Sequence, residues 1–340
     1  MVVCPSHLEH RLHAHTTKLK AFLRSFVESK VCLEENCFYD LVPHKFLINY
    51  YDVKNDITRY ILDNYERPTN YKYLKDLAVL IEKIRDQELK IDLTEIRDLA
   101  HTQQTKNFIN KVQQARPVCD YNMFGSKTGR LTTKPGSFPI LTMDKKYRSV
   151  LKPQNDWFVE LDFNAAELRT ILAMSGIDQP ATDIHDWNAK TIWKGSKTRE
   201  EAKKSIFAWL YNPNSKDTAP DKYYDREYLI EKHYDATAGI VTTPFGRDIE
   251  ADRHHAINYL VQSTTAEMTL KQIIRISKLL EGAKSFIAFT MHDSVVLDMS
   301  HDERSLLMVM LYSFASTDLG EYLVNISAGE NYGAMRNLTL

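Results

Sequence analysis

The amino-acid sequence predicts an α+β protein in which helices precede an antiparallel sheet, with a further helical segment inserted between its strands. Three observations support this. Apolar residues recur at helical spacing through residues 56–115, a strand-like run covers residues 157–163, and two more runs, 286–291 and 295–299, lie near the end. Because only three residues separate the last two runs, we expect them to form a hairpin. The helices between the first run and this hairpin would then interrupt one sheet.

Composition and charge are those of an ordinary globular chain. The 340 residues are 43% hydrophobic and 26% charged, with a net charge of −1. This length suits one large domain or two to three subdomains. The near-neutral charge argues against a chain that coats nucleic acid or anionic membranes non-specifically. The longest plain apolar run, residues 306–312, is far shorter than the roughly 20 residues of a membrane-spanning helix, and no signal peptide is visible.

The first 120 residues are expected to be helical. A stripe of apolar residues predicts a helix over residues 10–30, and the pattern returns over residues 74–84. Thr94 is the expected N-cap of another helix, which would run through Val112.

Two aspartates stand at the ends of strand-like runs. Asp162 comes near the end of the run 157–163, and Asp293 lies at the tip of the expected hairpin. Each carboxylate is flanked by residues that tend to be buried, so each charge needs a partner. Oxygen ligands from adjacent strands could hold a pair of Mg²⁺ ions, which would stabilise the attacking and leaving oxygens of a phosphoryl displacement. Taken singly, each aspartate is equally compatible with capping a strand end or a turn.

A second group of candidate residues lies on one helix. Arg199, Lys203, Phe207 and Tyr211 are spaced by four, so they form one gently winding stripe roughly 18 Å long. Two cations followed by two aromatic rings suit a nucleotide, with the cations on the triphosphate and the rings against the sugar and the bases. The stripe alone is also compatible with an amphipathic helix that buries its rings and solvates its cations.

At these positions the sequence resembles the family A DNA polymerases, the DNA polymerase I type. Residues 162–169 (Asp-Phe-Asn-Ala-Ala-Glu-Leu-Arg) resemble their motif A, the stripe resembles their motif B, and Met291-His292-Asp293 resembles their motif C. Four shorter matches are Thr128-Gly129-Arg130-Leu131, Asp183-Ile184-His185, Asn258 with Gln262, and Gly329-Glu330-Asn331-Tyr332. Seven matches in the family's order, over roughly residues 121–340, make coincidence a poor explanation.

The resemblance implies a right-hand polymerase with an antiparallel-sheet palm, helical fingers inserted in the palm and a reduced helical thumb-like N-terminal region. It places the thumb-like region at residues 1–120 and the fingers at 183–245. The palm would be split between residues 121–182 and 246–340. The residues before 121 show no paired Asp/Glu strand pattern, so we expect no proofreading exonuclease domain.

The function that the resemblance implies is template-directed DNA synthesis, in which dNTPs are added to a primer 3′-hydroxyl by two-metal-ion phosphoryl transfer. Asp162 and Asp293 would be the catalytic residues and would hold two Mg²⁺ ions, for which Mn²⁺ can substitute. The implied nucleotide-binding residues are His185, Arg199, Lys203, Phe207, Tyr211 and Glu167, the last as the gate against a ribose 2′-hydroxyl. The implied primer–template residues are Arg130, Asn258, Gln262 and His292, with Arg130 reading minor-groove acceptors.

One departure from the family pattern concerns the metal site. Ser294 stands where the family usually has a glutamate after the motif C aspartate, which puts the metal-supporting role of that glutamate in doubt. Two alternatives stay open: a single-subunit RNA polymerase or primase-like nucleotidyltransferase, and a catalytically weakened palm that binds DNA. Glu167 and Phe207 favour deoxynucleotides, and the intact aspartates and stripe favour catalysis.

Charge by region bears on the expected partners. Residues 121–211 carry 14 Lys and Arg against 10 Asp and Glu, whereas residues 212–340 carry 12 against 18. We expect primer–template DNA and dNTPs as partners, bound with modest affinity, strong salt sensitivity and low processivity. A separate exonuclease, a processivity factor, or a helicase or primase would be further partners, and no membrane is expected. The expected location is cytoplasmic, which includes a virus-encoded enzyme acting in its host cell.

Overall fold

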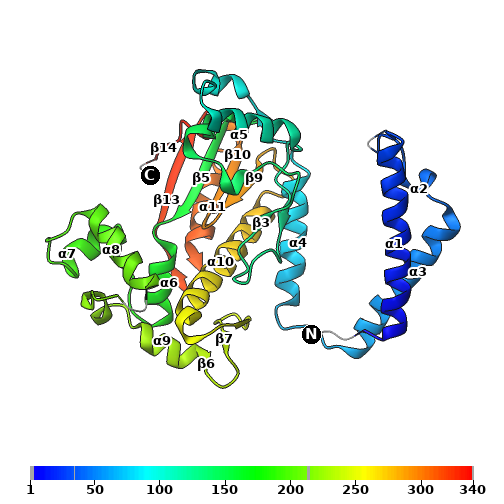
Figure 1. The fold of residues 1–340 in the computed structure, drawn as a ribbon. Coiled ribbons are helices and arrows are strands. Elements are labelled where there is room, and N and C mark those ends of the chain that lie inside the picture. Colours follow the sequence, from blue (N-terminus) through cyan, green and yellow to red (C-terminus); the bar gives the residue numbers. More distant parts are fainter. Residues whose placement is uncertain (1–3, 34, 213–214, 339–340) are drawn as a thin grey trace. The chain divides into compact units, whose positions relative to one another are not determined.

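The chain divides into two compact units in its computed structural model, which describes residues 4–33, 35–212 and 215–338 (Figure 1). The first unit runs from Met1 to Tyr71 and the second from Lys72 to Leu340. The expected thumb-like region, residues 1–120, is therefore distributed over both units.

The N-terminal unit is helical. Its elements are α1 (Ser6–Glu28), α2 (Phe38–Leu41) and α3 (His44–Asn64), and α1 packs against α3. The helix predicted over residues 10–30 is α1. Few side chains of this unit are buried, and a ring contact between Phe22 and Phe46, with centroids 5.2 Å apart, joins the two long helices.

A five-stranded antiparallel sheet forms the centre of the second unit. The strand order is β14-β13-β5-β10-β9. The strands are β5 (Trp157–Phe163), β9 (Phe286–Met291), β10 (Ser294–Met299), β13 (Val324–Gly329) and β14 (Arg336–Asn337). Every residue of β10 is buried, so its nearly continuous apolar sequence reflects cover on both faces.

The predicted hairpin between β9 and β10 is confirmed, with a tighter turn than expected. The last strand begins at Ser294 rather than at Val295, because the turn consists only of His292 and Asp293. His292 has a φ of 51°, the left-handed conformation that two-residue hairpin turns favour.

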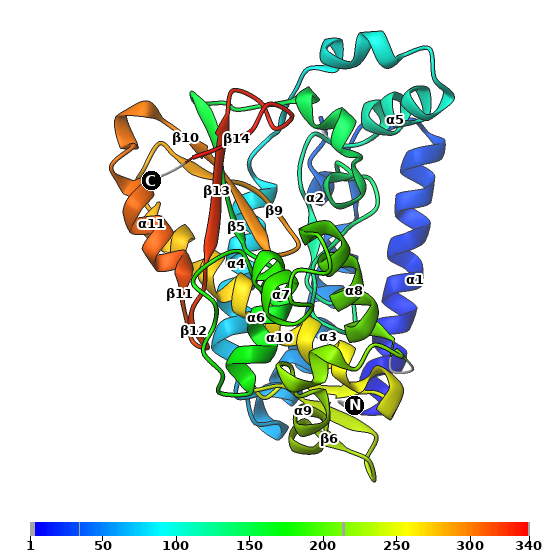
Figure 2. The ribbon, with the colours of Figure 1, turned by 90° about the vertical axis from the view of Figure 1, so that its left-hand side faces the viewer.

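Helices that precede β5 in the sequence and helices that follow it pack against this sheet in one apolar core. They are α4 (Tyr71–Arg85), α5 (Gln103–Gln114), α10 (Arg253–Leu279) and α11 (Leu306–Ala315). A second core is formed by α6 (Ala166–Met174), α7 (Ile184–Thr191), α8 (Arg199–Tyr211), α9 (Arg226–His233) and the first half of α10. Figures 1 and 2 both show α7, α8 and α9 grouped beyond the end of β5 at which α6 begins. Because α10 contributes to both cores, it connects the sheet to this helical group.

Short elements complete the second unit. Paired strands are β1 (Lys90–Ile91) with β4 (Leu151–Lys152), β2 (Tyr121–Asn122) with β3 (Thr132–Thr133), β6 (Tyr234–Asp235) with β7 (Ile240–Thr242) and β8 (Asp248–Glu250), and β11 (Ser316–Thr317) with β12 (Gly320–Glu321). Short 3₁₀ helices span Leu93–Leu99, Ile140–Thr142, Lys145–Val150, Ala219–Lys222 and His301–Glu303. In the described part of the chain, none of the helices combines the length and apolar character that crossing a bilayer requires.

The single helix expected from Thr94 through Val112 is wrong. Asp92 accepts a hydrogen bond from the Thr94 N–H at 3.0 Å and caps a short 3₁₀ helix that ends at Leu99. A separate helix, α5, follows Thr102, whose side chain accepts from the Thr105 N–H at 3.2 Å. Two capping side chains within ten residues therefore divide one apolar repeat into two helices.

Leu161→Ala should lower the free energy of unfolding of the second unit by about 2–5 kcal/mol, because this side chain is completely buried in β5. Leu279→Ala, on the same chain but 41% exposed on α10, should lower it by less than about 1 kcal/mol. Urea denaturation followed by tryptophan fluorescence measures both, since all four tryptophans lie in the second unit. Equal losses for the two variants would contradict the central position of β5 in the core.

Candidate active site

Asp162 and Asp293 lie on neighbouring strands at the same end of the sheet. In the antiparallel register of β5 and β10, Ser294 is opposite Asp162, and Asp293 immediately precedes Ser294 in the turn. The Phe163 N–H donates to the carbonyl oxygen of Asp293 at 3.4 Å, which ties the turn to the end of β5. Strand pairing thus brings together two carboxylates that are distant in the sequence.

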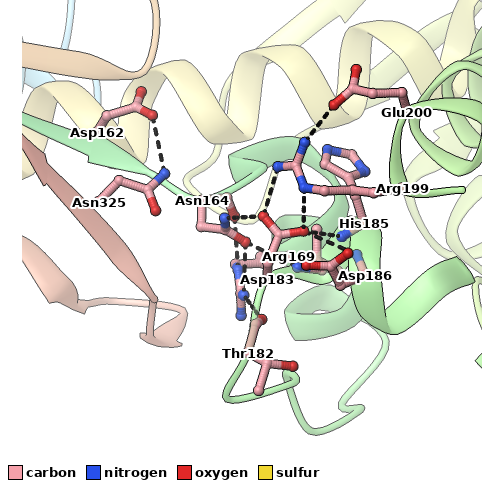
Figure 3. Close-up of polar contacts among 11 residues, drawn as sticks. Asp162, Asn164, Arg169, Thr182, Asp183, His185, Asp186, Arg199, Glu200 and Asn325 are labelled. Carbon is pink, nitrogen blue, oxygen red and sulfur yellow. Dashed lines mark hydrogen bonds and ion pairs between the residues drawn. The ribbon is translucent and has the colours of Figure 1, made fainter. Parts of the chain in front are cut away.

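Burial raises the pKa of both carboxyl groups. The pKa of Asp162 rises to about 7, first because of burial and then because of the like charge of Asp293. Burial also raises the pKa of Asp293, and the positive charge of Lys203 acts against the pKa shift at both sites. The side-chain amide of Asn325 donates to Asp162 at 3.4 Å (Figure 3). These neighbours do not balance two partly buried negative charges, so a divalent cation would stabilise the ionised pair.

The chemistry of these donors fits Mg²⁺. Within the described residues, no group of three or more His, Cys, Asp or Glu side chains is arranged to hold a metal ion by itself. Mg²⁺ is commonly held by one or two carboxylates, and water and substrate phosphates fill its other positions. Two aspartates are therefore a sufficient protein contribution for ions that share their ligands with a phosphorylated substrate, and Mn²⁺ takes the same oxygen donors.

Helix α8 carries the predicted stripe, and side-chain hydrogen bonds stabilise its first turn. Thr198 and Glu201 form a capping box, in which the Thr198 N–H donates to the Glu201 carboxylate at 2.8 Å. Lys203 is exposed, and its charge lowers the pKa of both Asp162 and Asp293 against their upward shift, so this cation acts on the carboxylate pair.

The aromatic half of the stripe is stacked, with Phe207 partly buried against the second core and Tyr211 exposed. The rings of Phe207 and Tyr211 are nearly parallel, 7° apart with centroids 5.9 Å from each other, and Tyr211 is 38% exposed. The ring of His185 lies 5.8 Å from that of Phe207. Burial lowers the pKa of His185 to about 4, and its Nδ1 is buried with no hydrogen-bond partner among the described residues. A neutral imidazole thus lies beside Phe207, and its buried Nδ1 is unpaired among the described residues.

Arg199 is paired inside the protein through a residue whose role sequence reasoning missed. Its guanidinium donates to Asp183 at 2.9 and 3.2 Å and to Glu200 at 2.7 Å (Figure 3). Asp183 is the N-cap of α7 and also accepts from the backbone N–H groups of His185 and Asp186. Burial raises the pKa of Asp183, but these hydrogen bonds outweigh burial and lower it below the ordinary value. An aspartate before the first helical residue was the signal that could have identified it.

Asn164 connects Asp183 to the strand that carries Asp162. Its side-chain amide donates to Asp183 at 2.9 Å, and its Oδ1 accepts from the buried guanidinium of Arg169 at 3.0 Å (Figure 3). Arg169 also donates to the carbonyl oxygens of Pro180 and Thr182, each at 2.8 Å. This network fixes the start of α7 relative to the end of β5. Neither Asn164 nor Arg169 was assigned a role from the sequence.

Glu167 lies between two predicted site residues. Its carboxylate accepts hydrogen bonds from Arg130 and from the hydroxyl of Tyr211. Burial raises the pKa of Glu167, although the charge of Arg130 acts in the opposite direction. The structure therefore joins the predicted minor-groove residue, the predicted sugar gate and the end of the α8 stripe in one hydrogen-bonded chain.

The remaining predicted residues fall in two places. Arg130 and His292 line the same small cavity of about 20 Å³. Asn258 and Gln262 lie one turn apart on α10, where the Oδ1 of Asn258 is buried without a partner among the described residues. No hydrogen bond within the described part of the chain joins these two amides to Asp162 or Asp293.

Arg247 is another residue that sequence reasoning missed. Gly129, just before Arg130, has a φ of 72°, and a Cβ there would lie 2.8 Å from Cζ of Arg247. The guanidinium of Arg247 in turn lies 3.9 Å from the buried carboxylate of Glu267 on α10. Gly129 therefore admits the guanidinium beneath the loop that carries Arg130, and the glycine was the only sequence signal of this contact.

Comparisons with known proteins bear on the fold. No protein-family model matches the sequence. A protein named DNA polymerase from Mycobacterium phage D29 is 23% identical over 54% of this chain and 38% of the phage protein. The solved POL domain of Pol1 from M. smegmatis, in complex with DNA primer-template and dNTP, aligns with a TM-score of 0.54 and 13% identity over 89% of this chain. The chain spans 55% of that structure's length and 38% of the phage protein's.

The chain therefore has the fold of a polymerase domain. The right-hand fold expected from the sequence resemblance, with an antiparallel sheet and inserted helices, is confirmed.

Without metal, wild-type protein should lose more stability than Asp162→Asn as the pH rises from 4 to 8. The carboxyl group of Asp162 titrates near 3.8 when unfolded and near 7 when folded, so the folded state retains a proton that the unfolded state has released. The stability that this retained proton contributes is fully present below the unfolded pKa and is lost as the pH rises through the folded pKa. The loss for wild type should exceed the loss for Asp162→Asn by about 4 kcal/mol, at roughly 1.4 kcal/mol per pKa unit. Urea unfolding at each pH measures it, and parallel curves for the two proteins would exclude the raised pKa.

Proposed function

We propose that this chain is a template-directed DNA polymerase that adds dNTPs to a primer 3′-hydroxyl by two-metal-ion phosphoryl transfer. The observation that carries the proposal is the meeting of Asp162 and Asp293 at the end of an antiparallel sheet, within the field of Lys203 on α8. The similarity to a phage protein named DNA polymerase and to a POL domain bound to primer-template and dNTP supports it.

Asp162 and Asp293 are the residues that would hold the metal ions. Mg²⁺ held by this pair would activate the attacking hydroxyl and neutralise charge on the leaving pyrophosphate. The protein's part is to hold both carboxylates in register, because burial disfavours their ionised forms and bound cations would favour them. The pairing of β5 with β10 and the short turn supply that rigidity.

Arg199, Lys203 and His185 would bind the triphosphate. In the structure Arg199 is already satisfied by Asp183 and Glu200, so a triphosphate oxygen would replace one of these partners rather than fill an empty position. Lys203 is exposed and would neutralise the departing pyrophosphate. Nδ1 of His185 is buried, so a bond from this atom to a phosphate oxygen would require the imidazole to be uncovered.

Glu167 would act as the gate that selects deoxyribose. Hydrogen bonds from Arg130 and Tyr211 hold its carboxylate in one place, so a ribose 2′-hydroxyl would meet a fixed group rather than a mobile one. Phe207 and Tyr211 would present a stacked aromatic surface to the sugar and the bases. This arrangement favours DNA synthesis over the RNA polymerase or primase-like alternative, and the intact carboxylate pair favours it over a palm that only binds DNA.

Primer–template DNA would lie along α10 and the β9–β10 turn. Arg130 and His292, which share one cavity, would contact the minor groove of the terminal pairs, and Asn258 and Gln262 would contact the template from α10. We assign the palm to residues 121–182 and 246–340, which contain the sheet, the fingers to residues 183–245 with α7, α8 and α9, and the thumb-like function to residues 1–120. Because its substrates are intracellular, we place the activity inside the cell. A separate exonuclease, processivity factor, helicase or primase would act beside it.

Asp162→Ala and Asp293→Ala should each reduce primer extension with Mg²⁺ and dNTPs by roughly a thousandfold, or about 4 kcal/mol of barrier, because each removes a metal-binding carboxylate. Asp178→Ala, which removes an exposed carboxylate, is the matched control and should extend normally.

In the same assay without dNTPs, a labelled primer should keep its 3′ end, since we propose that this chain does not proofread. Full extension by either site variant would refute the two-metal assignment, and trimming of the primer would refute the lack of proofreading.

Glu167→Ala should increase the use of rNTPs relative to dNTPs by about 10- to 100-fold, because it removes the group that a 2′-hydroxyl would contact. Glu231→Ala, on the exposed face of α9, should leave the ratio unchanged. Steady-state kcat/KM for matched rNTP and dNTP pairs measures the ratio. An unchanged ratio in Glu167→Ala would remove this residue as the gate.

A further inference from the structure

A third carboxylate, that of Glu160, lies on the same strand and the same face as Asp162. Glu160 precedes Asp162 by two residues on β5, so their side chains project from the same face of the sheet. Its negative charge is one of the causes that raise the pKa of Asp162. The family resemblance assigned no role to this residue.

Glu160 is held by the residue that departs from the family pattern. The hydroxyl of Ser294 lies 3.0 Å from Oε1 of Glu160 and 3.1 Å from the carbonyl oxygen of Met291. The hydroxyl of Tyr332 lies 3.4 Å from the same Oε1. Since Ser294 is the first residue of β10 and directly follows Asp293, these contacts place the Glu160 carboxylate against the residue that follows the motif C aspartate.

We propose that Glu160 supplies from β5 the carboxylate that Ser294 does not supply on β10, and thereby strengthens metal binding at Asp162 and Asp293. The inference rests on the proposed polymerase function. Because the described residues contain no ligand set of three such side chains, Glu160 acts as a positioning residue rather than as a ligand. Its charge adds to the negative potential at the metal ions, and its bond to Ser294 holds the backbone beside Asp293.

The arrangement is unfavourable unless a cation is bound. A third negative charge beside two buried carboxylates adds repulsion, and the neutral hydroxyls of Ser294 and Tyr332 offset only part of it. When divalent ions are bound, their positive charge attracts each carboxylate beside them. The third carboxylate then stabilises the site instead of adding to the repulsion. A purely structural role for Glu160 would not require a charge, and this difference can be measured.

The test is a titration of the protein with Mn²⁺ alone, in which electron paramagnetic resonance measures the free ion. Glu160→Gln keeps the size and hydrogen-bonding capacity of the side chain but removes its charge, and it should raise the Mn²⁺ dissociation constant by about three- to tenfold. The exchange variant Glu160→Ser with Ser294→Glu returns the carboxylate to β10 and keeps the net charge, and it should bind Mn²⁺ within about twofold of wild type. Glu231→Gln, an exposed charge on α9, should not change the affinity.

Two outcomes would overturn the inference: an unchanged Mn²⁺ affinity in Glu160→Gln, or an exchange variant that binds as weakly as Glu160→Gln while its circular dichroism and unfolding midpoint match wild type. Asp162→Asn separates this failure from failure of the proposed function. If Asp162→Asn loses both Mn²⁺ binding and primer extension while Glu160→Gln binds normally, only the role of Glu160 is wrong. If wild-type protein does not extend a primer, the proposed function is wrong.

Discussion

Two partly buried carboxylates on neighbouring strands are the constraint on which the rest of the structure depends. Burial disfavours the charged forms of Asp162 and Asp293 and raises the pKa of both groups, and the charge of Asp293 raises the pKa of Asp162 further. Such a pair persists only where surrounding structure holds it in place, and here the pairing of β5 with the fully buried strand β10 does so. The unfavourable free energy of two ionised carboxylates without a counterion also favours the binding of divalent cations.

The charged groups around this pair are bound to one another in a way that substrate would rearrange. Arg199 is paired with Asp183, and Arg130 is paired with Glu167. Binding a triphosphate would therefore exchange one set of charge-assisted hydrogen bonds for another, so the net gain depends on geometry more than on the number of contacts. Asn164 and Arg169 extend this coupling to the backbone between β5 and α7, which fixes where the cations of α8 stand relative to the carboxylates.

Sequence reasoning succeeded where a local pattern carries its own physical meaning. The strand that ends near Asp162, the final hairpin and the four-residue repeat of α8 were all predictable from apolar periodicity and spacing. It failed at Thr94, because neighbouring capping side chains compete and apolar periodicity cannot rank them. It also gave no role to Asp183 or Glu160, since each is ordinary in its own segment and becomes significant only through partners 16 or 134 residues away.

The sequence by itself determined which residue types are available for the chemistry: two aspartates at strand ends, a cationic and aromatic stripe, and Glu167 in the segment that follows Asp162. Apolar periodicity and turn residues involve neighbouring positions in the chain, so both can be recognised from the sequence alone. Only the tertiary structure decided that Ser294 pairs with Asp162, that Glu167 lies between Arg130 and Tyr211, and that the chain divides after Tyr71. The register between strands far apart in the sequence, such as β5 and β10, and the pairing of charged side chains are set by packing between those segments, which neither segment shows by itself.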